Sequence, residues 1–203
     1  TIEGIAEAGS TVELFNGDVS LGTTTADATT GIFSITPSSE LSEGLNSLTV
    51  TATDAINNVS AASSALSITV DTTAPTQPAI TTTTTLTSDA TPTIEGTAEA
   101  GSTVTLFVDG VTTGITTTAD NNGVFSMTTP TLADNNYSLS VTATDAQGNT
   151  SSESSALSIT VDTTAPVAPT FTTADTTTNN TTPIISGIAE EGSTVTLFVD
   201  GVT

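Results

Sequence analysis

The sequence predicts an all-β protein built from small antiparallel β-sandwiches that repeat in tandem. Three observations support this fold class. About a quarter of the 203 residues are Thr, a β-branched residue that favours strands over helices. Apolar and polar residues alternate over short segments that Gly, Asn, Asp and Pro separate, which is the pattern of strands and turns. Long stretches also recur about 91 positions later, so the repeating unit is one small domain.

The repeat is clearest in two motifs. Ile94–Val104 (IEGTAEAGSTV) restates Ile2–Val12 (IEGIAEAGSTV), and Ile185–Val195 restates both. Asp71–Pro75 (DTTAP) returns unchanged at Asp162–Pro166. Agreement of this length and order indicates successive copies of one domain.

These motifs divide the chain into three parts. Residues 1–75 are a first repeat that lacks its first strand, residues 76–166 are a complete second repeat, and residues 167–203 are a partial third. The first copy begins at the second strand of the unit, and the third stops after its third strand. We therefore expect an excerpt from a longer array.

The second repeat holds seven expected strands. They are placed near Ile80–Leu86, Pro92–Ala98, Thr103–Val108, Val111–Thr118, Gly123–Thr129, Tyr137–Thr144 and Ser155–Val161. Asp109-Gly110 and, in the first repeat, Asn16-Gly17 are hairpin turns, because both positions of each pair tolerate positive φ. Seven short strands without helical periodicity indicate an antiparallel sandwich, and their connections fit an immunoglobulin-like topology better than a barrel.

Period-2 alternation in the last two strands of each repeat predicts which side chains are buried. These residues are Leu48, Val50, Leu66 and Ile68 in the first repeat and Leu139, Val141, Leu157 and Ile159 in the second.

Three motif blocks in this order carry a resemblance to a known family. Ile94–Val104, Gly123–Ser126 (GVFS) and Thr142–Asn149 (TATDAQGN) resemble the bacterial Ig-like repeat that fills the stalks of giant biofilm adhesins. The resemblance covers essentially the whole chain. It implies a linear array of seven-stranded Ig-like sandwiches outside the cell or on its surface, with neighbouring repeats of the same chain as partners. The first repeat has Asn57-Asn58 where the family favours Gly-Asn, so we expect that loop to bend differently.

The composition excludes several classes of function. The chain has 22 acidic residues and no Lys, Arg, His or Cys, so its formal net charge is -22. No surface can neutralise phosphates, which excludes nucleic acid as a partner. No apolar run is long enough to insert in a membrane. Ser-His-Asp, Cys-His and Schiff-base chemistry are impossible. Paired carboxylates of a glycosidase are less expected than acidic loops on a solvated surface, so we predict no enzyme.

Calcium is the cofactor that the composition favours, because hard oxygen ligands are plentiful and soft nitrogen or sulfur ligands are absent. In an Ig-like sandwich, three loops meet at the pole where the preceding linker arrives. In the second repeat these loops carry Glu99, Asp120 and Asp145, and the linker carries Asp71. With no basic residue in the chain, a cation from solution is the available counter-charge.

The same pattern recurs in the other copies, with Asp162 and Glu190 in the third and Glu7, Asp27 and Asp54 in the first. Each acidic residue also has a purely structural interpretation. Asp71 and Asp162 can begin turns before Pro75 and Pro166, Glu99 can cap a turn, and Asp120 can form an Asx turn with Gly123. Solvated acidic poles therefore stay as the alternative to calcium sites.

The sequence favours a mechanical function. We expect a stalk segment of a large adhesin, in which Ca²⁺ at each junction holds neighbouring repeats in line. One alternative is a segment of a self-assembling filament, sheath or surface layer with lateral homotypic contacts. A third is an accessory carbohydrate-binding module of a secreted enzyme, which the shortage of aromatic side chains disfavours: they are 3% of the chain.

Overall fold

The computed structural model describes residues 1–200, which form strands, turns and loops. The chain divides into two compact units. Unit 1 comprises Thr1–Pro75 together with Asp145–Thr150, and unit 2 comprises Thr76–Thr144 and the residues from Ser151 onward. Over residues 1–200, no helix is long and apolar enough to cross a membrane.

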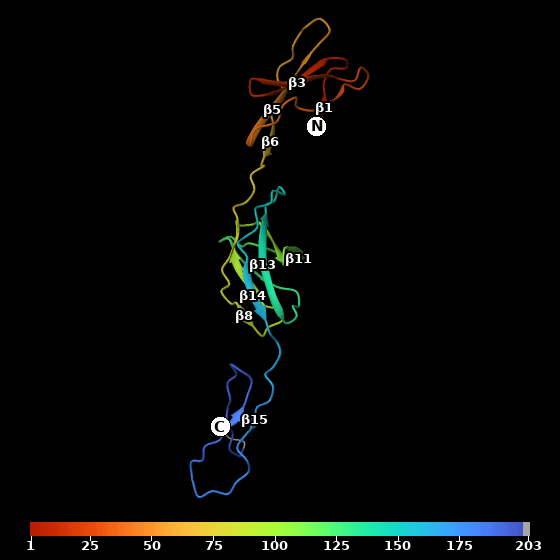
Figure 1. Cartoon of the computed structure of the whole chain (residues 1–203). Helices are drawn as coiled ribbons and strands as arrows, with labels where there is room; N and C mark the ends of the chain where they lie inside the picture. The colour runs from red at the N-terminus through yellow and green to blue at the C-terminus, as the bar shows by residue number, and fades with distance from the viewer. Residues whose placement is uncertain (201–203) are drawn as a thin grey trace. The chain divides into compact units, whose positions relative to one another are not determined.

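Unit 1 contains two antiparallel sheets that enclose a small core (Figure 1). One sheet has the order β3 (Val19–Thr25), β2 (Thr11–Asn16), β5 (Gly44–Thr53) and β6 (Leu66–Val70), and the other pairs β1 (Ile2–Ile5) with β4 (Ile32–Ile35). The core consists of Val12, Leu14, Leu21, Ala26, Phe33, Ile35 and Leu48. Successive side chains point to opposite faces of a strand, so the intervening Thr, Ser and Glu face outward.

Unit 2 has the same plan with more strands (Figure 1). Its larger sheet has the order β11 (Val111–Thr118), β10 (Thr103–Val108), β13 (Asn135–Thr144), β14 (Leu157–Val161) and β8 (Leu86–Thr87). Its smaller sheet has the order β12 (Val124–Thr128), β9 (Thr93–Thr97) and β7 (Ala79–Ile80), and a separate pair joins β15 (Thr170–Phe171) to β16 (Gly187–Ile188). The core includes Ile94, Val104, Leu106, Phe125, Met127, Leu139, Val141 and Ile159. The all-β fold class is confirmed, and the predicted strands after the first match within two residues at each end.

The first strand of the second repeat is split, so the prediction of one strand over Ile80–Leu86 is wrong. β7 pairs with β9 in the smaller sheet, whereas β8 runs parallel to β14 in the larger sheet. The amides of Thr81 and Thr82 donate to the Glu95 carbonyl at 2.8 and 3.3 Å as the chain leaves β7. The segment crosses from one sheet to the other at the edge of the sandwich, which one regular strand cannot do.

The predicted core-facing side chains are buried or packed against a core, with one exception. Leu66 is 46% exposed, so its predicted burial is wrong. It lines an open groove with Ile2, Ile5 and Val50. Its counterpart Leu157 lies beside the segment 77–80, which shields it from solvent.

The two hairpins turn at equivalent positions of the repeat, and the prediction for the first one is off by one residue. Val108 pairs with Val111, and Asp109 and Gly110 between them have φ of 52° and 75°, as a type I′ turn requires. In the first repeat Asn16 is the last strand residue and pairs with Val19. The turn is therefore Gly17-Asp18 instead of the predicted Asn16-Gly17, with Gly17 supplying the positive φ of 61°.

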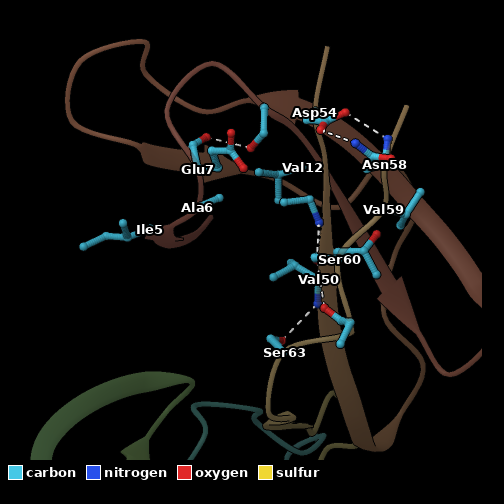
Figure 2. A pocket seen from close by; sticks show the side chains of 14 residues that line it. Ile5, Ala6, Glu7, Val12, Val50, Asp54, Asn58, Val59, Ser60 and Ser63 are labelled. Atoms are coloured by element: carbon cyan, nitrogen blue, oxygen red, sulfur yellow. Dashed lines mark hydrogen bonds between the residues drawn. The ribbon is translucent and has the colours of Figure 1, made fainter. Parts of the chain in front are cut away.

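Serine residues cover the edge of the long strand in each unit. The Ser63 amide donates to the Val50 carbonyl at 2.9 Å, and the Ser63 hydroxyl accepts from the Val50 amide at 3.1 Å. Ser60 forms the same pair with Ala52 (Figure 2). Unit 2 repeats the arrangement with Ser154 on Val141 and Ser151 on Ala143. We call these serines the seryl edge caps.

Candidate functional site

The acidic loops of one repeat share one end of its sandwich because of the sheet register. In unit 1, Thr11 at the start of β2 pairs with both Thr25 at the end of β3 and Thr53 at the end of β5. The loops before Thr11 and after the other two residues therefore leave the sheet at the same end. In unit 2, Thr103 holds the same position, opposite the ends of β11 and β13.

Glu7 and Asp54 line the same groove at this end of unit 1 (Figure 2). Asp54 accepts hydrogen bonds from the Asn58 side-chain amide at 2.7 Å and from the backbone amides of Asn58 and Ile56 at 2.8 and 3.0 Å. The Asn58 side chain is the largest cause that lowers the pKa of Asp54 below its ordinary value. This carboxylate orders its own loop.

Asp27 behaves in the same way in the neighbouring loop. Its Oδ1 accepts the amides of Thr30 and Thr29 at 2.7 and 2.9 Å and the Thr30 hydroxyl at 2.9 Å. These bonds, with the Thr30 amide first, lower the pKa of Asp27. The Ala6 amide joins this loop to the loop of Glu7 through the Gly31 carbonyl at 2.9 Å.

Asp145 and Asp71 are brought together through one side chain. The Asn149 amide donates to Asp145 Oδ2 at 2.8 Å and to the Asp71 backbone carbonyl at 3.1 Å, all within unit 1. Asp145 Oδ1 also accepts the amides of Asn149 and Gln147 at 2.8 and 2.9 Å. Desolvation raises the pKa of Asp145, but the bonds from Asn149 and Gln147 outweigh it, and the pKa is lowered.

The loop that we expected to bend differently in the first repeat keeps its conformation. Asn57 adopts a φ of 67° where Gly148 has 94° in the second repeat. Asn is among the few residues that tolerate this region, so it replaces Gly without a new loop shape. The closing bond is 3.0 Å in both loops, from the Asp54 amide to Asn58 and from the Asp145 amide to Asn149.

Glu99 and Asp120 lie in adjacent loops of unit 2, which the Ala98 amide joins by donating to the Gly123 carbonyl at 2.8 Å. Asp120 Oδ1 accepts the amides of Val124 and Asn122, each at 2.8 Å. Val124 is the first cause of the lowered pKa of Asp120. Asp120 therefore forms an Asx-type turn through the Asn122 amide, whereas Gly123, the partner expected from the sequence, donates to the Asp120 backbone carbonyl at 2.9 Å.

Glu99 forms its turn through the backbone. Its carbonyl accepts the Ser102 hydroxyl at 2.7 Å and the Ser102 amide at 3.0 Å. Neither bond uses the carboxylate, so the turn leaves the charged group of Glu99 on the surface.

Three of the predicted carboxylates accept hydrogen bonds from backbone amides in or next to the linkers: Asp71, Asp162 and Glu190. Asp71 Oδ1 accepts the Thr73 amide and Asp162 Oδ1 accepts the Thr164 amide, each at 3.1 Å, so both aspartates begin turns. Glu190 Oε2 accepts the amide of Val167, the residue after the second linker, at 3.1 Å.

The donor chemistry fits calcium, but the grouping of carboxylates is sparse. Among residues 1–200, no three Asp or Glu side chains are close enough together to hold a metal ion. The Asn149 side chain bonds to the Asp145 carboxylate and to the backbone carbonyl of Asp71. A calcium ion bound there would need backbone carbonyls or water to complete its six to eight oxygen ligands.

Two acidic residues that the sequence interpretation did not select also bind the linkers. Glu43 accepts the Thr72 hydroxyl at 2.6 Å, the Thr72 amide at 3.0 Å and the Thr73 hydroxyl at 3.2 Å. Asp134 occupies the same place in the second repeat and accepts hydroxyls from Thr163 at 2.6 Å and Thr164 at 2.5 Å, with the Thr163 amide at 2.9 Å. We call each arrangement a linker clasp. The signal available in sequence was an acidic residue recurring 91 positions apart, 29 residues before a Thr-Thr pair.

The fold and the acidic loops together define a protein of tandem immunoglobulin-like sandwiches. The chain belongs to the bacterial Ig-like domain family, whose profile matches residues 1–72 and 76–163. The resemblance found in the sequence motifs is thereby confirmed. No curated protein matches the chain.

Several solved structures are similar to the chain. One is a Ca²⁺-stabilized adhesin that helps an Antarctic bacterium reach out and bind ice, with 33% identity, a TM-score of 0.46, and coverage of 82% of this chain and 43% of that one. Another is a 1.5-MDa bacterial ice-binding adhesin, with 24% identity, a TM-score of 0.44 and coverage of 80% and 56%. The fibronectin(III)-like modules of Clostridium thermocellum CbhA have 19% identity, a TM-score of 0.44 and coverage of 79% and 82%. The chain spans about half the length of these two adhesin structures.

Proposed function

We propose that the chain is a stalk segment of a large extracellular bacterial adhesin, divided into repeats at residues 75/76 and 166/167, and that Ca²⁺ at the linkers restricts bending. One observation carries the proposal: two consecutive bacterial Ig-like domains are joined by a short linker that begins with Asp71, in a chain of 22 acidic and no basic residues. Such a chain has no internal counter-charge, so divalent cations of the surrounding medium are its natural partners. The role is mechanical, without catalysis.

Asp71 and Asp145 are the first candidates to hold the ion, because Asn149 already joins the linker to the Asp145 loop. Glu99 and Asp120 are the further candidates, because their loops leave the second sandwich at the end where β13 runs into Asp145. Calcium would supply positive charge and bind oxygens from several segments at once.

The equivalent residues of the other copies would serve their own linkers. These residues are Asp162 and Glu190 for the third copy and Glu7, Asp27 and Asp54 for the first. Extracellular calcium modules bind with dissociation constants of about 10⁻⁴–10⁻³ M, so millimolar calcium would fill such sites.

Calorimetric calcium titration and small-angle scattering of the 203-residue chain test the proposal together. We expect calcium binding and a narrower distribution of interdomain angles than in chelator. The double variant Asp71→Asn/Asp145→Asn should lose the calcium bound at this junction and the narrowing that it causes, while Asp18→Asn, which removes one charge from an exposed hairpin turn, should keep both. Equal distributions in calcium and chelator would exclude calcium stiffening. Association that grows with protein concentration would instead favour the filament alternative.

A further inference from the structure

The linker clasps follow from the register of the strands that flank them. Gly44 pairs with Val70 at the end of the β5–β6 ladder, so Glu43 stands opposite the start of the linker. In the second repeat Asn135 pairs with Val161, which places Asp134 opposite the second linker. The acidic residue is fixed by the last pair of the ladder and lies within reach of the Thr-Thr pair that leaves the sheet.

Each clasp engages both threonines of its linker. In unit 1, the Glu43 carboxylate accepts from Thr72 and Thr73, and Asp71 Oδ1 accepts the Thr73 amide. Thr72 and Thr73, the second and third residues after β6, are therefore both held by acidic side chains. Bonds in which the acceptor is ionised are shorter and stronger than neutral ones, and the Thr72 and Thr73 hydroxyls have no competing basic group in this chain.

Both carboxylates respond to these donors. The Thr72 hydroxyl is the largest cause of the lowered pKa of Glu43, and the Thr163 hydroxyl is the largest cause for Asp134. The ionised acid is thus the form that the linker holds. Glu and Asp serve equally at this position, so the carboxylate group matters more than the length of its side chain.

We propose that Glu43 and Asp134 are linker-positioning residues, which fix the direction in which the chain leaves each sandwich through the Thr-Thr pair and without a metal ion. The contact stands on its own geometry, while its role in a stalk rests on the proposed function. Calcium is proposed on the carboxylates of Asp71 and Asp145. The clasp uses the carboxylate of Glu43 and the Thr72-Thr73 pair.

The test is Glu43→Gln, with ¹⁵N relaxation of the Thr72 and Thr73 amides as the readout. Gln keeps the size but has one uncharged acceptor oxygen, and its NH₂ group replaces the second acceptor that the carboxylate offers to the Thr72-Thr73 pair. We expect the order parameters of both amides to fall from about 0.85 towards 0.6 or below. Glu43→Asp should keep them high, because Asp performs this role in the second repeat. Glu40→Gln, in the same exposed loop, is the matched control and should change nothing.

The second repeat provides an independent measurement, with Asp134→Asn and the amides of Thr163 and Thr164. All spectra are recorded in calcium and in chelator, and the core resonances of Val12 and Leu48 show that unit 1 stays folded. Rigid linker amides in Glu43→Gln, or equal loosening by Glu40→Gln, would overturn the inference. Rigid Thr72 and Thr73 amides in the wild-type chain in chelator would support the inference. This test does not depend on whether calcium restricts the junction.

Discussion

The side-chain amide of Asn149 donates a hydrogen bond of 3.1 Å to the backbone carbonyl of Asp71, 78 positions earlier in the chain. The same amide also bonds to Asp145. In the first repeat, Asn58 makes the equivalent bond to Asp54. The Asn149 side chain thus joins the Asp145 carboxylate to the linker. Asn58 makes only the equivalent of the Asp145 bond, so the two residues can be compared.

Replacing Asn149 by Ala should destabilise its loop and free the linker carbonyl. Asn58→Ala removes the equivalent turn contact, so the difference between the two variants reports the bond to Asp71. We expect Asn149→Ala to cost about 1 kcal/mol more than Asn58→Ala, the net value of one hydrogen bond. Urea denaturation followed by NMR of both units measures this. Equal costs would show that the Asp71 contact contributes nothing to stability.

Calcium should raise the thermal stability of the wild-type chain. At a calcium concentration about 100 times the dissociation constant, binding to the folded state stabilises it by about 2.7 kcal/mol. In Asp145→Asn this rise should shrink strongly, because Asn keeps a carbonyl oxygen for the loop amides but not the charge. Differential scanning calorimetry with calcium and with chelator distinguishes the cases. An Asp145→Asn protein that gains as much as the wild type would remove Asp145 from the ligand set.

Acid should weaken the Asp120 loop. The pKa of Asp120 is lowered in the folded protein by the amides of Val124 and Asn122. A lowered folded-state pKa contributes stability above the ordinary carboxyl range, near pH 4, and that contribution is lost as pH falls through the folded-state value. Protonation also relieves repulsion among 22 acidic side chains, which acts in the opposite direction.

The difference between wild type and Asp120→Asn separates the two effects, because repulsion elsewhere is common to both. Asp120→Asn should be less stable than wild type at pH 7 and equal to it near pH 2. Urea midpoints over this range, followed through the fluorescence of the single tyrosine, Tyr137 in unit 2, give the comparison. A stability difference that does not change with pH would contradict it.

Gly96→Ala should damage the second repeat more than Gly4→Ala damages the first. A Cβ at Gly96 would overlap both the Ala79 carbonyl oxygen of β7 and the Phe125 ring, whereas a Cβ at Gly4 would meet only the Phe33 ring. That ring borders an open groove, so it can move. We expect a cost of about 2–3 kcal/mol for Gly96→Ala and about 1 kcal/mol for Gly4→Ala. Denaturation monitored by NMR in each unit measures both, and equal costs would show that β7 is not held as closely as the structure indicates.

The sequence predicts well the features that depend on the alternation of apolar and polar residues along a strand. Leu139, Val141 and Ile159 are buried because their strands expose alternate faces, and the strand bounds follow from the same pattern. Leu66 has the same local sequence as Leu157, yet it is exposed, because burial also depends on the segment that lies beside it. Local pattern cannot report such a neighbour.

Less of the candidate site than of the fold could be predicted from the sequence. Topology alone places the loops of Glu7, Asp27 and Asp54 at one end of a sandwich, and the register shows it. The roles of Glu43 and Asp134 depend on which residues close the last strand pair, and composition does not give that register. Whether an acidic side chain orders its own loop or faces solvent is also decided by backbone amides that the sequence does not display.

The seryl edge caps have a consequence for folding in a chain of similar repeats. β6 and β14 share the sequence LSITV, and β5 and β13 both end in VTAT. Strands with such similar sequences can be exchanged between neighbouring domains during synthesis. An unpaired strand edge is where such an exchange begins. At Val50, Ala52, Val141 and Ala143, serine supplies both the donor and the acceptor that a foreign strand would have offered. Each domain thereby closes these positions with its own chain, so that neighbours with the same strand sequences can fold one after another without exchanging strands.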